Sequence, residues 1–95
     1  MFKIELIFDE TLEESKLRKI GATIDEFFAE DNIKKAEKTL TSRTYYDNGY
    51  ESDFGKMWAS LCQIKNTMNF SAFLKEAYWY ENDEKDDIIT EFFNR

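Results

Sequence analysis

The segment FKIELIF, residues 2–8, decides the fold class of this 95-residue chain. Apolar and charged residues alternate along it, with Ile7 as the exception. A period of two is typical of a β-strand that buries one face. We therefore predict a strand over residues 2–8 whose far end, at Ile7, is covered on both sides.

The following segment predicts an amphipathic helix over about residues 12–30. Thr11 and Glu14 have the spacing of a capping box, in which each side chain bonds to the backbone of the other residue. Gly21 lies beside the apolar stripe, where it either permits a close approach to the sheet or has no special role. The stripe itself recurs at helical spacing and consists of Leu17, Ile20, Ile24, Phe27 and Phe28.

The middle of the chain predicts a second strand and a second helix. Residues 38–46 are rich in Thr and Tyr and favour a strand, and the Asp-Asn-Gly at 47–49 favours a turn. Residues 50–54 form either a short returning strand or a loop into the next helix. Apolar residues then follow helical spacing from Phe54 to Met68, with Ser52 or Asp53 as the N-cap, and residues 66–69 end the helix.

The last third leaves one alternative open. The apolar spacing over residues 70–81 favours a short amphipathic helix, although AYWYE (77–81) would also make a strand. We expect Asn82 to cap a final helix with Asp83, Glu84, Asp86 and Asp87 in its first turns, where the helix dipole favours anions. Its core contacts would be Ile88, Ile89, Phe92 and Phe93.

These elements predict a single compact domain spanning residues 1–95. Strands and helices in this order are typical of the α+β class. We expect a small antiparallel or mixed sheet of two to three strands, with two to four helices packed on one face.

Composition narrows the class of partner. With 20 acidic and 13 basic residues the net charge is −7, which argues against direct nucleic-acid binding and against anionic membrane surfaces. The same charge favours a basic protein partner. A single cysteine, no signal-peptide pattern and no apolar run of about 18 residues predict a cytoplasmic protein.

The sequence offers little for catalysis. The absence of histidine removes the usual triads and the commonest general base near neutral pH. Cys62 lies beside Leu61 on the apolar face of its helix, so we expect a buried, inert thiol. No phosphate-binding glycine loop and no EF-hand spacing occur. We therefore predict that the chain is not an enzyme and holds no cofactor or metal.

Acidic residues gather next to aromatic ones, in DEFFAED (25–31) and in the segment from Tyr78 to Asp87. Some of the aromatic residues among Tyr45, Tyr46, Tyr50, Trp79 and Tyr80 should be exposed, and exposed aromatics beside acids are typical of an interface. A competing interpretation is a solvated acidic face that maintains solubility. The candidate partner contacts are Tyr78, Trp79, Tyr80, Glu81, Asp83, Glu84, Asp86 and Asp87, with Asp47, Glu51 and Asp53 as a second patch.

The basic residues between Lys34 and Arg43 have two interpretations. They could contact phosphate, but we expect them to balance the neighbouring acidic helices. Acids on successive helical turns would stand about 5–6 Å apart, which is comparable to the spacing of phosphates along one DNA strand. A folded acidic face could therefore occupy a groove that evolved for nucleic acid.

A short, acidic, aromatic-rich chain with stretches such as DEFFAED, YYDNGYESDF and YWYENDEKDDIITEFF resembles the anti-CRISPR proteins and other DNA-mimic inhibitors of phages and mobile elements. The resemblance is one of composition and rests on no shared motif, so no residue role is carried over. It implies a non-enzymatic protein that blocks an RNA-guided CRISPR nuclease or a restriction enzyme, either by competing with DNA or by locking a conformation.

Two other functions remain open at this point. An immunity protein that neutralises a toxin nuclease would use the same electrostatics with a different partner. A structural or regulatory subunit would instead self-associate, with Trp79 and Phe93 as its oligomer contact.

Overall fold

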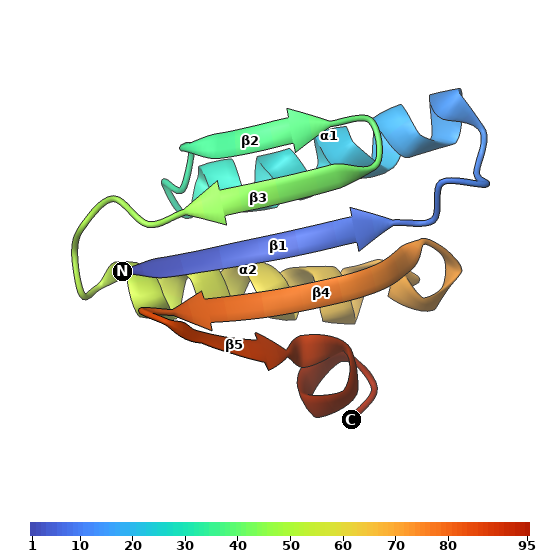
Figure 1. The fold of residues 1–95 in the computed structure, drawn as a ribbon. Helices are drawn as coiled ribbons and strands as arrows, with labels where there is room; N and C mark the ends of the chain where they lie inside the picture. Colours follow the sequence, from blue (N-terminus) through green and yellow to red (C-terminus); the bar gives the residue numbers. More distant parts are fainter.

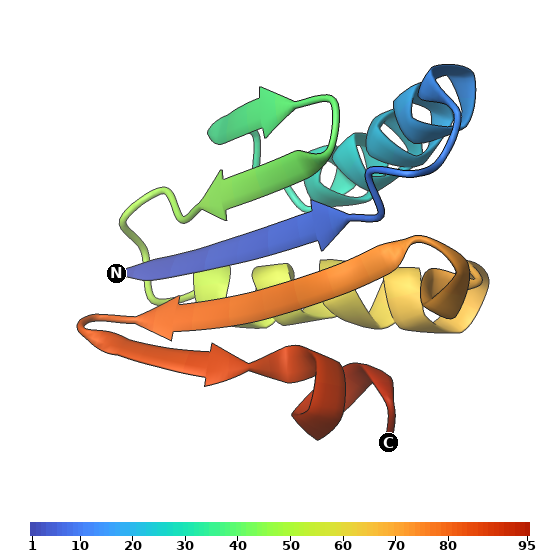
Figure 2. The same ribbon diagram turned by 45° about the vertical axis from the view of Figure 1, so that its right-hand side comes forward.

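The computed structural model describes residues 1–95 as a five-stranded antiparallel sheet with two helices on one face (Figures 1 and 2). The regular elements, in chain order, are β1 (Phe2–Phe8), α1 (Glu14–Glu30), β2 (Ala36–Thr39), β3 (Ser42–Tyr46), α2 (Asp53–Thr67), β4 (Leu74–Glu81) and β5 (Glu84–Asp87). A 3₁₀ turn, η1 (Phe70–Ala72), precedes β4, and a π-helical turn, η2 (Ile89–Phe93), follows β5.

The strand order is β2-β3-β1-β4-β5, so each helix connects two strands that have a third strand between them. The first six long elements run β-α-β-β-α-β, which is the split arrangement of ferredoxin-like domains. β5 then extends the sheet by a hairpin at the β4 edge. Since one fold of this type hosts many functions, the topology does not by itself assign one.

The first strand is confirmed with one buried face, and it lies at the centre of the sheet, although Ile7 is only half-buried and not covered on both sides. Ile4, Leu6 and Phe8 are completely buried beneath the helices, while the alternate residues lie on the opposite face. Antiparallel partners on both sides complete the pairing, because Ile4 stands opposite Tyr45 of β3 and Trp79 of β4. Burial of each such side chain stabilises the fold by about 1.5–3 kcal/mol.

The first helix is confirmed, but its predicted capping box is wrong. The helix begins at Glu14, and Glu13 at the N-cap makes no side-chain hydrogen bond. Thr11 instead donates its backbone N–H and its hydroxyl to the Asp9 carboxylate, at 2.9 and 2.7 Å. The local Asp9–Thr11 turn therefore uses the threonine before the helix starts.

The predicted single strand over residues 38–46 is a hairpin. Residues 40 and 41 form a turn between β2 and β3, and the Thr39 and Ser42 hydroxyls are hydrogen-bonded across it at 2.7 Å. Threonine and tyrosine content indicated strand but gave no sign of the turn, since no glycine, asparagine or proline marks it. The residues after Gly49 form a loop into α2.

The largest corrections fall in the last third of the chain. Of the two alternatives for residues 70–81, the favoured helix is wrong and the strand is confirmed: residues 74–81 form β4, with Ala77 and Trp79 facing the core and Tyr78 and Tyr80 facing outward. The predicted cap and first turns of the final helix are also wrong, because Asn82 adopts a positive φ of 56° and turns the chain back into β5. An asparagine tolerates this left-handed conformation, so a tight hairpin replaced the expected helix cap. Only the π-helical turn η2 follows, and the expected core contacts of Ile88, Ile89, Phe92 and Phe93 are confirmed.

The α+β class is confirmed, and the expected two to three strands are corrected to five. Both helices cover the same face of the sheet, which leaves the other face without a covering layer (Figure 2). Neither helix combines the length and apolarity needed to cross a bilayer.

Candidate protein-binding site

The β4–β5 hairpin brings most of the predicted contact residues to one edge of the sheet (Figure 1). β5 is an outer strand, and every residue from 81 to 87 is exposed. Five of these seven residues are acidic, and we call them the acidic edge: Glu81, Asp83, Glu84, Asp86 and Asp87.

No cation of the protein neutralises the acidic edge. The carboxylates in the four salt bridges belong to Glu14, Asp25 and Glu10, none of which lies on the hairpin. Lys85 interrupts the acids in sequence, but its ammonium lies 4.0 Å from the centre of the Tyr78 ring, on the open face of the sheet. The acidic edge therefore presents five exposed carboxylates that form no salt bridge, with Lys85 as the one cation among them.

The strand geometry changes the expected spacing of these charges. Alternate residues of a strand project to the same side and stand about 6.8 Å apart, which is wider than the helical spacing expected from the sequence. Glu84 and Asp86 share one side of β5, whereas Asp87 projects to the other. The charges consequently form a line along the edge of the sheet, with both of its sides occupied.

Trp79 lies in the core and is only 4% exposed, so it is not available as a protruding anchor. Its ring stacks on Trp58 with centroids 4.8 Å apart and on Phe2 at 5.6 Å. Trp79 is also the cross-strand neighbour of Asp86. Trp79 faces the core because it lies on the helix-facing side of β4. Its predicted role as an exposed contact is therefore wrong, and it is a buried residue next to the exposed Asp86.

The second predicted patch separates into structural and exposed residues. Asp47 is buried and accepts the Phe2 backbone N–H at 3.0 Å. Asp53 is 1% exposed and accepts the N–H groups of Asn48 and Tyr50 at 2.7 and 3.2 Å, which holds the loop before α2. Only Glu51 of this patch is exposed, so Asp47 and Asp53 are corrected to loop-stabilising residues.

Tyr78 and Tyr80 are half-buried on the open face of the sheet. The Tyr78 hydroxyl donates to Glu76 at 2.7 Å, and this hydrogen bond is the main reason that its pKa is raised to about 12. Burial, followed by a hydrogen bond to Glu5 at 2.9 Å, raises the pKa of Tyr80. Both rings remain neutral donors at physiological pH, and each has a carboxylate beside its hydroxyl.

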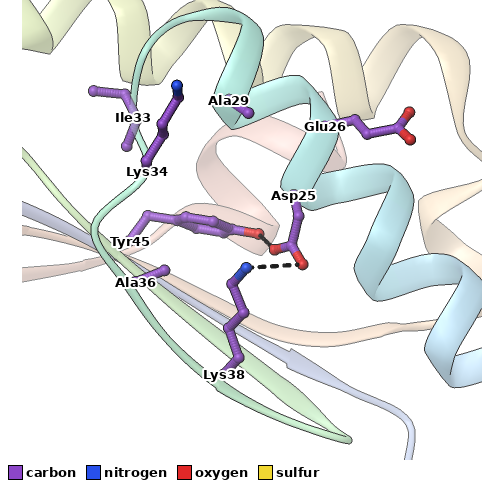
Figure 3. A pocket seen from close by; sticks show the side chains of 8 residues that line it. All are labelled: Asp25, Glu26, Ala29, Ile33, Lys34, Ala36, Lys38 and Tyr45. Atoms are coloured by element: carbon purple, nitrogen blue, oxygen red, sulfur yellow. Dashed lines mark hydrogen bonds and ion pairs between the residues drawn. The ribbon is translucent and has the colours of Figure 1, made fainter.

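A polar cluster at the opposite edge of the sheet escaped the sequence analysis. Asp25 of α1 accepts hydrogen bonds from Arg43 Nε at 3.0 Å and from the Tyr45 hydroxyl at 2.5 Å, and it pairs with Lys38 at 3.3 Å. Figure 3 shows Asp25 between Tyr45 and Lys38, at the rim of a pocket of about 230 Å³ between α1 and β2. We call Asp25, Lys38, Arg43 and Tyr45 the Asp25 cluster.

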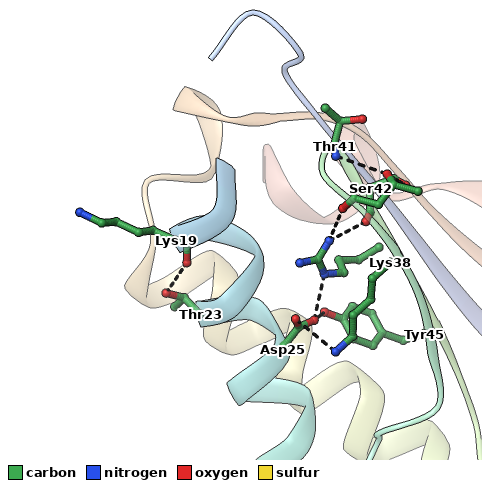
Figure 4. A network of polar contacts seen from close by, with 9 residues as sticks. Lys19, Thr23, Asp25, Lys38, Thr41, Ser42 and Tyr45 are labelled. Carbon is green, nitrogen blue, oxygen red and sulfur yellow. Dashed lines mark hydrogen bonds and ion pairs between the residues drawn. The ribbon is translucent and has the colours of Figure 1, made fainter. Parts of the chain in front are cut away.

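The Asp25 cluster connects α1 to the β2–β3 hairpin through hydrogen bonds and ion pairs (Figure 4). Arg43 also donates to the backbone carbonyl of Ser42 at 2.9 Å, and the Tyr45 ring stacks on Phe28 with centroids 3.8 Å apart. Burial and the bond to Asp25 raise the pKa of Tyr45. Every charge in the cluster has a partner, which indicates a structural role, and the expectation that Lys38 and Arg43 balance an acidic helix is confirmed.

Gly21 supplied a second sequence signal for this cluster, beside the basic residues that were expected to balance an acidic helix. A Cβ at that position would overlap the Arg43 guanidinium, so the glycine does permit the close approach of helix and sheet. The sequence could indicate the close approach but could not name Arg43 as the group that makes it.

Two further predictions concern the exposure of Cys62 and of the tyrosines. Cys62 is exposed, so its expected burial beside Leu61 is wrong: the next helical position lies about 100° around the axis. Tyr50 is 69% exposed, in agreement with the expectation of exposed aromatic residues, whereas Tyr45 is buried. No three His, Cys, Asp or Glu side chains converge closely enough to hold a metal ion.

Comparison of the chain with protein-family models, with curated proteins and with solved structures finds no match.

Proposed function

We propose that this protein is a non-enzymatic inhibitor that binds a basic, nucleic-acid-handling enzyme through its acidic edge. The observation that carries the proposal is the set of five exposed carboxylates along one edge of the sheet without an ion pair. An RNA-guided CRISPR nuclease is the favoured target, because such an enzyme holds nucleic acid in a positively charged channel.

Electrostatic complementarity supports a basic partner. Oppositely charged surfaces steer encounter and raise association rates, and they suppress wrong partners. Strand pairing fixes the backbone that carries the carboxylates of β5, so a partner has to order their side chains but not the backbone. The acids would take positions that the enzyme otherwise offers to phosphates.

The edge position of the acids also bears on self-association. An exposed outer strand is a template for pairing with another strand, and charged side chains oppose this pairing. Two copies of the acidic edge would repel each other, whereas a basic surface would not. This geometry favours a foreign basic partner over an oligomer built through β5.

The test compares two triple variants with the same change in net charge. Glu81→Gln/Asp83→Asn/Glu84→Gln alters the acidic edge, and Glu13→Gln/Glu26→Gln/Glu30→Gln alters exposed acids of the α1 region. The partner is first captured from nuclease-treated host lysate with the tagged wild-type chain, eluted by a salt gradient and identified. Association is then measured with the purified partner.

We expect the acidic-edge variant to associate about tenfold more slowly at low salt and the α1 variant to associate nearly as fast as wild type. The partner's nuclease activity should fall when wild-type chain is added. Equal rates for both variants, or a partner that resists salt and keeps its activity, would contradict the proposal. A captured toxin nuclease that acts without guide RNA would replace the CRISPR target with the immunity role.

A further inference from the structure

A pocket lies against the helix-facing side of the β4–β5 hairpin, next to α2 and η2. Its volume is about 300 Å³, at the lower limit for ligand pockets, so it suits one side-chain head group and not an extended ligand. Three aromatic rings and three charged groups line it, and we call it the tryptophan pocket: Trp58, Trp79, Phe92, Asp86, Glu91 and Arg95.

The aromatic walls of the tryptophan pocket are suited to a cation. Trp58 and Trp79 are stacked at 27°, and Phe92 meets Trp58 nearly edge-on, at 65° with centroids 5.2 Å apart. Trp79 stacks on both Trp58 and Phe2 and is 4% exposed, so it borders the pocket without a free face. The half-buried Trp58 therefore supplies the indole surface that a guanidinium group favours. The Lys65 ammonium donates to the Phe92 backbone carbonyl at 2.6 Å and lies 4.9 Å from the centre of the Phe92 ring, so this ring already has one cation beside it.

The carboxylates of the pocket are free to pair. Asp86 and Glu91 are exposed, and neither takes part in a salt bridge. Asp86 belongs to β5 and Glu91 to η2, so the two acids approach the pocket from different elements. An incoming cation would therefore contact aromatic faces and anionic oxygens together.

We infer that the tryptophan pocket binds an arginine side chain of the basic partner. The inference rests on the proposed function and deepens it, since arginine is the residue that nucleic-acid-binding surfaces use for bidentate contacts to phosphates and to guanine. Capture of such an arginine would remove a group that the partner needs for its own substrate. The acidic edge attracts the partner, and the tryptophan pocket supplies the anchor.

Arginine fits better than lysine or an apolar side chain. A planar guanidinium stacks on aromatic rings and can bond to a carboxylate with two parallel N–H groups, whereas an ammonium is a strongly hydrated point charge. An apolar side chain would leave Asp86 and Glu91 without partners. The pocket therefore selects for charge and planarity together.

Arg95 is a competitor within the same chain. It lines the pocket yet forms no salt bridge with Asp86 or Glu91. Its positive charge opposes the entry of a second cation, so its removal should strengthen binding of an external guanidinium group.

The pocket can be tested without the partner, because the only two tryptophans of the chain both line it. The probe is N-acetyl-arginine amide, and the matched control is N-acetyl-citrulline amide, which has nearly the same shape without the charge. Binding is followed through the two indole N–H signals in a ¹H–¹⁵N correlation spectrum. The variants are Asp86→Asn/Glu91→Gln and Arg95→Ala, with Glu30→Gln on α1 as the control for loss of an exposed acid away from the pocket and the acidic edge.

We expect the arginine probe to shift both indole signals and the citrulline probe to leave them unchanged at equal concentration. The dissociation constant should rise about fivefold in Asp86→Asn/Glu91→Gln and fall about twofold in Arg95→Ala, and Glu30→Gln should change it little. Absence of any shift with arginine, or equal shifts with citrulline, would overturn the inference. A stronger response to the apolar probe N-acetyl-norleucine amide would assign the pocket to an apolar side chain.

The same variants separate this inference from the proposed function. If Asp86→Asn/Glu91→Gln loses the arginine probe and speeds dissociation of the partner, the pocket is the anchor. If it loses the probe while partner dissociation is unchanged, the anchoring role is refuted and the acidic edge alone remains. If the acidic-edge triple variant has no effect on the partner, the proposed function fails whatever the probe does.

Discussion

Carboxylates have opposite surroundings at the two edges of the sheet. At the β2–β3 edge, Asp25 is matched by Arg43, Lys38 and the Tyr45 hydroxyl. At the β4–β5 edge, the five carboxylates of the acidic edge have no ion pair. The first arrangement joins a helix to the sheet and stabilises the fold, whereas the second leaves its carboxylates exposed to solvent.

The largest expected difference in stability between the two edges comes from replacing one cation at each of them. Arg43→Met keeps much of the side-chain volume but leaves the Asp25 carboxylate with fewer partners and removes the bonds to the carbonyls of the β2–β3 turn. We expect the free energy of unfolding to fall by about 2 kcal/mol, less than for a fully buried pair because the Asp25 side chain is 23% exposed. Urea denaturation followed by circular dichroism measures the change.

The matched control at the other edge is Lys85→Met. Lys85 makes no salt bridge, and its contact with Tyr78 is an exposed cation–π interaction, so its loss should cost less than about 1 kcal/mol. A larger loss for Lys85→Met than for Arg43→Met would mean that the acidic edge, and not the Asp25 cluster, contributes more to folding.

Replacing each of the two helical glycines by alanine should change the free energy of unfolding by a smaller amount, and the two changes should have opposite signs. Gly21→Ala would push its Cβ into the Arg43 guanidinium, so the gain in helix propensity is outweighed by displacement of the Asp25 cluster, and we expect a net loss of about 1 kcal/mol. Gly55→Ala meets nothing within 4 Å and should stabilise the protein by about 0.5 kcal/mol. Thermal and urea unfolding of the pair check both signs; a stabilising Gly21→Ala would show that Arg43 relocates without cost.

The sequence predicted best where one physical pattern dominated. The alternation over FKIELIF predicted the central strand, and the apolar stripe from Leu17 to Phe28 predicted α1, because burial of one face determines both elements. The strand count was too low for three separate reasons. Helical spacing over residues 70–81 favoured a helix where β4 lies. The β2–β3 turn lacks marker residues, and the acids after Asn82 suit a helix start as well as a hairpin.

The candidate site was predictable only as composition. The acid content predicted negative charge near residues 81–87. Whether Trp79 faces the solvent depends instead on the alternation of side chains along β4. The apolar spacing that also fits a helix obscured this alternation. Asp47 and Asp53 look like surface acids in sequence, and only the folded loop supplies the backbone N–H groups that they accept. Trp58 and Glu91 meet Asp86 through tertiary packing, for which the sequence gives no local signal.

The smallest expected effect concerns the stability of the acidic edge itself. Glu81 and Glu84 stand directly opposite each other in the β4–β5 pair, and like charges in that position are destabilising. Glu84→Gln should therefore raise the free energy of unfolding by about 0.2–0.5 kcal/mol at low salt, and the gain should vanish at high salt because the pair is exposed. The control Glu51→Gln removes an exposed acid that has no opposing carboxylate in the sheet and should give no gain.

A gain of this kind would sharpen the contrast between the two edges. A residue pair that lowers stability in the isolated chain is consistent with selection for something other than folding, since functional sites are where local rules of stability are broken. If Glu84→Gln instead destabilised the protein at low salt, the acidic edge would contribute to its own fold, and its free charge would no longer argue for a partner. The sign of this small change in the free energy of unfolding therefore tests whether the acidic edge has a role other than folding.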